Sequence, residues 1–245
     1  MALVKARACR LRVSTYFRGG ELAIGMSRAS REAVMTLDEY VTWAAGLDKN
    51  QQASGPEDRP LREVGLAFAS EIGEVAGILV KWLRDVERWR DELADELGDV
   101  AYYWARLCVV TGVAPSTLLA RSQAHVEWRR AGRPAGGPEP GAGALTLEEY
   151  AAWAVEAVDA RETDGSDRQA LADVGLALVG DAGEVVECLR KLAREGDGQR
   201  ERLAGELGDV WRYWTRLCLA SGNTPADLLM RSRARIETRL TRETR

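Results

Sequence analysis

The sequence predicts an all-α protein of two tandem four-helix units that pack as an intramolecular pseudo-dimer. The segment LDEYVTWA, from Leu37, recurs as LEEYAAWA from Leu147, and ELGDVAYYWARLC, from Glu96, recurs as ELGDVWRYWTRLC from Glu206. Both pairs share one offset of about 110 residues, which indicates two copies of one unit. The alternation of β-branched and polar residues that marks strands is nearly absent. Two copies are too few for a solenoid, so a fused pseudo-dimer is expected.

The repeat sets the expected domain boundaries. Residues 1–35 match nothing later in the chain, and two interpretations stay open: a disordered extension, or a translation start at Met26. Residues 36–130 form the first unit and residues 145–245 the second. Between them, residues 131–144 read AGRPAGGPEPGAGA, a Gly, Pro and Ala composition that is typical of a flexible linker.

Each unit carries signals for four helices. The first begins with a capping box, in which a Thr and a Glu three residues later satisfy each other's backbone N–H groups. The third helix should end near a glycine, and the fourth should begin at a proline, which suits a first helical turn. The capping boxes are Thr36 with Glu39 and Thr146 with Glu149. The expected second helices are Leu61–Asp85 and Leu171–Glu195, and the expected third helices are Arg90–Thr111 and Arg200–Ser221. The closing glycines are Gly112 and Gly222, and the prolines that begin the fourth helices are Pro115 and Pro225.

Composition narrows the class of protein. A net charge of −4 and a pI of about 5.4 argue against a nucleic-acid polymer as partner. The single histidine, His125, argues against histidine-based catalysis or a His-rich zinc site. The sequence contains no apolar run of transmembrane length and no secretory signal, so we expect no membrane association and a cytoplasmic location. The four cysteines lack metal-ligand spacing and are expected as free thiols: Cys9, Cys108, Cys188 and Cys218.

Two pairs of acids stand out in the first unit. Helix two carries Glu71 and Glu74, and helix three carries Glu96 and Asp99. Residues three apart on a helix share a face, with about 5–6 Å between their Cβ atoms. The midpoint between the pairs is Asp85, about 12 residues or roughly 18 Å of helix from each pair. If the chain reverses there, the four acids meet on antiparallel helices. We call them the first cluster.

The second unit repeats this pattern with Asp181, Glu184, Glu206 and Asp209, which we call the second cluster. The intervening residues 195–198 read EGDG, a strong turn signal. Four convergent carboxylates repel one another unless protons or a cation intervene. Oxygen-only ligands suit Mg²⁺ or Mn²⁺ rather than Zn²⁺, and Mg²⁺ commonly binds phosphate oxygens as well. Both clusters are therefore candidate metal sites, and solvated acidic helix faces are the alternative interpretation.

These motifs resemble a known family. SEIGEV (Ser70–Val75) followed by DELGDV (Asp95–Val100) is similar to the paired ExxE and ExxD helices of the MazG-like all-α nucleoside-triphosphate pyrophosphohydrolases. The second unit reads GDAGEV and then GELGDV. The resemblance covers both repeats, roughly three-quarters of the chain, and depends on the order, spacing and helical context of the motifs.

The resemblance implies Mg²⁺-dependent hydrolysis of a standard or modified (d)NTP to the monophosphate and pyrophosphate. It implies that Glu71, Glu74, Glu96 and Asp99 are catalytic and hold the metal, and that the second cluster holds metal in the same way. It also implies a bundle formed by helices of two protomers, a role that the two linked units would take here. A homodimer of the whole chain stays open.

The sequence departs from the family in ways that bear on activity. A further Glu often precedes the first motif of the family, and here that position is Ser70 in one unit and Gly180 in the other. Asp181 replaces a longer Glu. The last helix of the family tends to carry an Asn and a Lys, where comparable positions here are Ser122 with His125 and Ser232 with Arg235. The first unit is therefore the better candidate for an active site.

Other side chains are candidates for substrate binding, each with a structural alternative. Lys81 and Lys191 follow the acidic pair by two turns and are candidates for phosphate contacts, although they are equally typical of exposed helix lysines. Trp104 and Trp214 are candidates for stacking on a base, although aromatic residues inside a bundle usually form the core. The arginines of helix four are candidates for phosphate contacts or solvated charges: Arg121, Arg129, Arg231 and Arg239.

Two other classes of function are consistent with the sequence. A nucleotide- or metal-sensing module with little turnover would explain the missing Glu at Ser70 and Gly180. A structural helical protein would keep its acidic faces in solvent and gain no stability from Mg²⁺ or Mn²⁺. The preferred base and sugar leave no trace in the sequence.

Overall fold

A computed structural model describes residues 35–48, 59–84, 89–135, 137–138, 145–157 and 167–243. These residues form eight α-helices and one 3₁₀ turn, and no strand occurs among them, which confirms the predicted all-α class. The elements, in chain order, are α2 (Leu37–Asp48), α3 (Arg59–Leu83), α4 (Trp89–Thr111), α5 (Pro115–Arg130), α6 (Leu147–Glu156), α7 (Asp167–Glu195), η2 (Asp197–Gln199), α8 (Arg200–Ala220) and α9 (Pro225–Glu243).

The helix ends follow the local signals. The Thr36 and Glu39 side chains bond each other's backbone N–H groups, and Thr146 and Glu149 do the same. Gly112 and Gly222 have φ angles of +67° and +86°, a left-handed conformation that glycine adopts without strain. Helices α3 and α7 begin earlier than expected, at Arg59 and Asp167.

The second repeat reverses direction where its turn signal predicts. Helix α7 ends at Glu195, Gly196 has a φ of +76°, and the short 3₁₀ turn leads directly into α8. The corresponding reversal of the first repeat, near Asp85, lies outside the described residues. So do residues 1–34, which include Cys9, and half of the linker.

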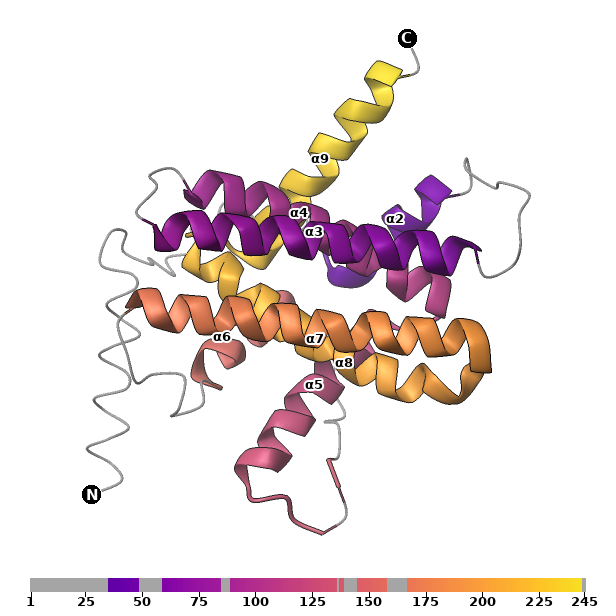
Figure 1. Ribbon diagram of the computed structural model, residues 1–245, viewed down its shortest axis with the longest axis vertical. Helices are drawn as coiled ribbons and strands as arrows, with labels where there is room; N and C mark the ends of the chain where they lie inside the picture. Colours follow the sequence, from indigo (N-terminus) through magenta and orange to yellow (C-terminus); the bar gives the residue numbers. More distant parts are fainter. Residues whose placement is uncertain are drawn as a thin grey trace.

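Two long helical hairpins form the centre of the molecule (Figure 1). Helix α3 packs on α4, α7 packs on α8, and α3 lies beside α7. Glycines permit the contact between α3 and α7, because a Cβ at Gly65 would lie 3.0 Å from Leu189 Cδ1, and one at Gly175 would lie 2.3 Å from Leu79 Cδ1. The equivalent positions of the two repeats thus make equivalent contacts across a pseudo-twofold axis.

The last helix of each repeat packs on the other repeat. Helix α5 contacts α8, and α9 contacts α4, while the free ends of α5 and α9 project in opposite directions (Figure 1). The two repeats therefore do not form separate domains in space, because each completes the helical packing of the other.

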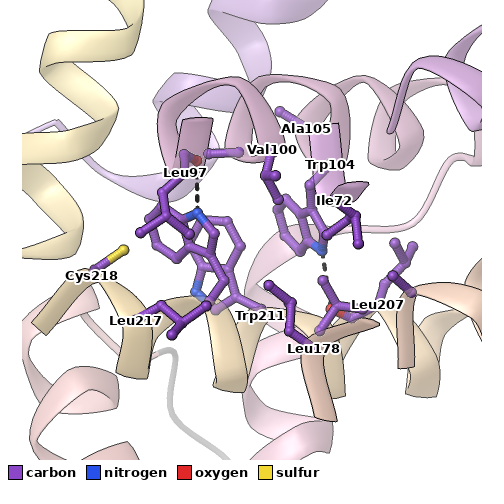
Figure 2. Close-up of a cluster of buried hydrophobic side chains, with 14 of the residues drawn as sticks. Ile72, Leu97, Val100, Trp104, Ala105, Leu178, Leu207, Trp211, Leu217 and Cys218 are labelled. Carbon is purple, nitrogen blue, oxygen red and sulfur yellow. Dashed lines mark hydrogen bonds between the residues drawn. The ribbon is translucent and has the colours of Figure 1, made fainter. Parts of the chain in front are cut away.

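Tryptophan hydrogen bonds cross between the repeats at the centre of the core (Figure 2). The indole N–H of Trp104 donates to the Leu207 carbonyl at 3.0 Å, and that of Trp214 donates to the Leu97 carbonyl at 2.8 Å. Trp211 stacks on Trp214 with ring centroids 4.2 Å apart and lies 4.3 Å from the Trp104 ring. Such aromatic pairs stabilise a core by about 0.5–1.5 kcal/mol beyond their area. The three tryptophans join the two hairpins into one core.

The composition predicted free cysteines and no transmembrane segment. Cys108, Cys188 and Cys218 are buried free thiols, as predicted. Within the described ranges, no helix is both long enough and apolar enough to cross a bilayer.

Candidate metal centre

The hairpin of α3 and α4 brings the acids of the first cluster together. Glu71 and Glu74 lie one turn apart on α3, and Glu96 and Asp99 lie one turn apart on α4. One carboxylate oxygen from each of Glu71, Glu96 and Asp99 lies within 4.8 Å of the other two. In the described part of the chain no other set of three potential metal ligands meets this distance. Glu74 is exposed at the edge of the cluster.

The first cluster is electrostatically strained. The pKa of Glu71 is raised to about 7, mainly by burial and then by the charges of Asp99 and the other cluster acids. Burial and the charge of Asp99 also raise the pKa of Glu96 above its usual value. Convergent carboxylates with raised pKa values hold protons until a cation replaces them. The donor set, three carboxylate oxygens, fits Mg²⁺ or Mn²⁺.

Helix α9 of the second repeat supplies the positive charge beside this cluster. The Arg235 guanidinium forms an ion pair with Asp99 and donates to the Asp95 backbone carbonyl at 2.9 Å. It also lies 3.7 Å from the Asp95 carboxylate, to which Arg231 pairs at 2.7 Å. Asp95 thus anchors both arginines at the edge of the first cluster.

A buried serine fixes the position of α9 along α4. Ser232 Oγ donates to the Gly98 carbonyl at 2.8 Å and lies 2.9 Å from the Tyr40 hydroxyl. A Cβ at Gly98 would lie 3.2 Å from Ser232 Cβ, so glycine permits this close approach. The requirement for glycine at position 98 is therefore explained by helix packing. One turn after Ser232, Arg235 reaches the cluster.

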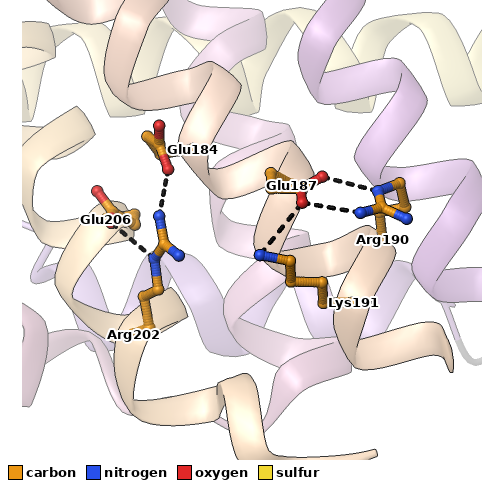
Figure 3. A network of polar contacts seen from close by, with 6 residues as sticks. All are labelled: Glu184, Glu187, Arg190, Lys191, Arg202 and Glu206. Atoms are coloured by element: carbon orange, nitrogen blue, oxygen red, sulfur yellow. Dashed lines mark hydrogen bonds and ion pairs between the residues drawn. The ribbon is translucent and has the colours of Figure 1, made fainter. Parts of the chain in front are cut away.

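The second cluster lies on α7 and α8 but has different neighbours. Burial is the main cause that raises the pKa of Asp181 to about 7, with Asp209 next. Arg202 forms an ion pair with Glu184 and lies 3.4 Å from Glu206 (Figure 3). Arg212, with a side chain only 6% exposed, lies 3.9 Å from Asp209. Two arginines of α8 itself therefore stand among these acids.

The candidate substrate-binding residues fall into two groups. Trp104 and Trp214 are fully buried, and their indole N–H groups bond backbone carbonyls, which favours the core role over stacking on a base. Lys81 pairs with Glu92 at 3.8 Å, and Lys191 pairs with Glu187 at 3.2 Å (Figure 3). Each ion pair lies within one hairpin, and neither includes an acid of the two clusters.

Arg129, near the end of α5, and Arg239, near the end of α9, influence the pKa of residues in the opposite repeat. Burial and the nearby Glu71 raise the pKa of Tyr103, and the charge of Arg239 opposes them. In the second cluster, burial and Asp209 raise the pKa of Asp181, and the charge of Arg129 opposes them in the same way. Arg239 therefore lies within electrostatic range of Tyr103, and Arg129 within electrostatic range of Asp181, and both arginines are exposed to solvent.

Sequence reasoning missed three contributors: Asp95, Arg202 and Arg212. Asp95 becomes Gly205 in the second repeat, Arg202 replaces Glu92 and Arg212 replaces Tyr102. These charge differences between otherwise matching repeats were the sequence signal that could have identified the three residues. Interpreting that signal required knowing which side chains face the clusters.

Comparisons with protein-family models, curated proteins and solved structures find no match to this chain.

Proposed function

We propose that the chain is a divalent-metal-dependent hydrolase that converts a nucleoside triphosphate to the monophosphate and pyrophosphate. The observation that carries the proposal is the convergence of Glu71, Glu96 and Asp99 within 4.8 Å on two neighbouring helices. The resemblance of both repeats to MazG-like pyrophosphohydrolases supports the choice of reaction. The fold supports it further, because the crossed contacts of α5 and α9 fit a pseudo-dimer of two such units.

The roles of the residues follow from their chemistry. Glu71, Glu96 and Asp99 would hold Mg²⁺ or Mn²⁺, with Glu74 at the exposed edge of the cluster. The bound cation would neutralise phosphate charge and activate the attacking water. Arg235 and Arg231 hold a positive charge beside the cluster, in position to attract the polyphosphate. Arg239 adds an exposed charge within electrostatic range of Tyr103.

The test is release of pyrophosphate from a panel of NTPs and dNTPs with Mg²⁺ or Mn²⁺. We expect turnover in the wild type and its loss in Glu96→Gln, which removes a metal-binding charge but keeps the shape of the side chain. The matched variant Glu206→Gln changes the equivalent residue of the second cluster. Folded wild-type protein that releases no pyrophosphate from any nucleotide would overturn the proposal.

A second candidate is a metal- and nucleotide-binding module with little turnover. The observation that favours it is Ser70, which is exposed beside Glu71 where the MazG-like family often carries a Glu. This candidate predicts that nucleotide with Mg²⁺ raises the melting temperature without pyrophosphate release. Introducing the carboxylate with Ser70→Glu would then be expected to increase turnover.

A further inference from the structure

The two acidic clusters occupy equivalent positions but differ in the cations built around them. Helix α8 carries Arg202 and Arg212, whereas the equivalent positions of α4 are Glu92 and Tyr102. The repeat therefore provides an internal comparison, in which helix α8 carries two positive charges at positions where α4 carries none.

Arg202 spans the two helices of the second cluster. Its guanidinium forms an ion pair with Glu184 on α7, and its Nε lies 3.4 Å from Glu206 Oε1 on α8 (Figure 3). It thus lies between one acid from each helix of the second cluster. A guanidinium suits this role because its planar set of donors can serve two carboxylates at once.

Arg212 adds a buried positive charge on the other side of the second cluster. Its side chain is 6% exposed, its Nε lies 3.9 Å from Asp209 Oδ1, and its guanidinium lies 4.0 Å from the Tyr213 ring centroid. Burial strengthens the interaction between charges because water screens them less. Arg202 is about half exposed and can swing away, but Arg212 is held in place.

The first cluster lacks both features. Glu92 faces Lys81 at 3.8 Å, and the ring of Tyr102 packs 6.0 Å from that of Trp43. The arginine that does reach this cluster, Arg235, pairs with Asp99. The ion pairs that Arg235 and Arg231 form in the described part of the chain go to Asp95 and Asp99, which leaves Glu71 and Glu96 available to a metal.

We propose that Arg202 and Arg212 take the place of a divalent cation in the second cluster, so that the chain has one metal centre, in the first cluster. Two positive charges already lie among these acids. They repel a dication, and they neutralise the negative charge that would otherwise attract one. The second repeat then serves the first by supplying α9 with Arg235. This inference rests on the proposed function for the identity of the first cluster as the metal centre.

The test measures binding of Mn²⁺ alone, through the electron paramagnetic resonance signal of the free ion, with no nucleotide present. We expect the paired variant Glu71→Gln with Glu96→Gln to lose saturable Mn²⁺ binding. The matched pair Asp181→Asn with Glu206→Gln, at the equivalent positions of the second cluster, should bind as the wild type does. Circular dichroism establishes that each variant is folded. An equal loss of bound Mn²⁺ in the second pair would overturn the inference.

A gain-of-binding variant tests the role of the arginine directly. Arg202→Gln should bind more Mn²⁺ than the wild type, whereas Arg202→Lys, which keeps the charge, should not. A purely structural role of Arg202 would leave Mn²⁺ binding unchanged in both variants and would overturn the inference. Wild-type protein that binds no Mn²⁺ would contradict the proposed function, but a gain in Arg202→Gln would still support the role of the arginine.

Discussion

The guanidinium of Arg235, in the last helix of the second repeat, forms an ion pair with the carboxylate of Asp99 in the first repeat. Two hydrogen bonds to backbone carbonyls of α4 hold Arg235 in position beside Asp99. Arg235 donates to the Asp95 carbonyl, and Ser232, one turn earlier on α9, donates to the Gly98 carbonyl. The candidate metal centre is therefore composed of residues from both repeats. This arrangement leads to the first prediction.

Replacing Arg235 with alanine should lower kcat/KM for the nucleoside triphosphate. Residues that support metal ligands typically cost about 10–100-fold when they are removed, and we expect a loss in this range. Steady-state measurement of pyrophosphate release provides the value. Arg242→Ala is the control, because Arg242 is an exposed arginine on the same helix. Equal activities of the two variants would show that the ion pair with Asp99 is dispensable.

The glycines of the ELGD motifs should resist replacement by alanine. A Cβ at Gly208 would lie 3.0 Å from Ser122 Cβ and 3.1 Å from the Leu118 carbonyl oxygen, which cannot move independently of its helix. Overpacking of this kind typically costs about 1–3 kcal/mol, so urea unfolding of Gly208→Ala should show a loss of stability. Gly98→Ala meets Ser232 Cβ at 3.2 Å and should lose less.

Gly73→Ala is the control for the glycine variants. Gly73 lies in α3 with nothing within 4 Å of an added Cβ. Alanine there should stabilise the protein by about 0.5–1 kcal/mol, because glycine costs more conformational entropy in a helix. Destabilisation by all three substitutions would indicate that helix contacts are not what requires glycine at 98 and 208.

The tryptophan bonds between the repeats should contribute measurably to stability. Trp104→Phe removes the indole N–H that donates to the Leu207 carbonyl, and the loss of such a hydrogen bond typically costs about 0.5–1.5 kcal/mol beyond the lost packing. Trp211→Phe is the matched variant, since the Trp211 indole N–H is buried without a hydrogen-bond partner in the described part of the chain. Chemical unfolding should therefore show a larger loss for Trp104→Phe. The reverse order would argue against a role of the bond to Leu207.

The metal-free protein should lose stability as the pH rises toward neutral. The pKa of Glu71 is raised from its ordinary value of 4.5 to about 7 in the fold, so the folded state binds this proton more tightly than the unfolded state does. Stability from this group is therefore complete below about pH 4.5 and is lost as the pH rises to about 7. The pKa of Asp181 is raised in the same direction, from 3.8 to about 7.

Urea midpoints measured with a chelator at about pH 5 and about pH 7 test this expectation. Glu71→Gln removes the titrating group and should reduce the loss of stability between the two pH values. A loss as large as that of the wild type would mean that Glu71 does not titrate in this range.

The sequence predicted the helices and the meeting of the acids because both depend on local rules. The capping boxes of Thr36 and Thr146 and the glycines that end α4 and α8 act within one or two turns of chain. The three-residue spacing of Glu96 and Asp99 determines their shared face in the same way. A reversal midway between the acidic pairs was the one further assumption.

Local sequence rules could not predict the contacts that α5 and α9 make with the opposite repeat. Nothing in the spacing of α5 and α9 shows that each packs on the other repeat, because this depends on the approach of whole helices. Asp95 and Arg202 looked like surface charges in the sequence, and only the packing of α9 and α7 places them beside Arg235 and Glu184. Trp104 and Trp214 were open to either role until their bonds across the repeats assigned them to the core.

The joining of both repeats in one chain has a genetic consequence. In a symmetric homodimer a single codon change alters two places at once, and any gain at one site is tied to its effect at the other. Here the codon for Arg202 is separate from that for Glu92, so a charge can enter one half while the other half keeps its acid. Fusion thus frees the two halves to specialise independently.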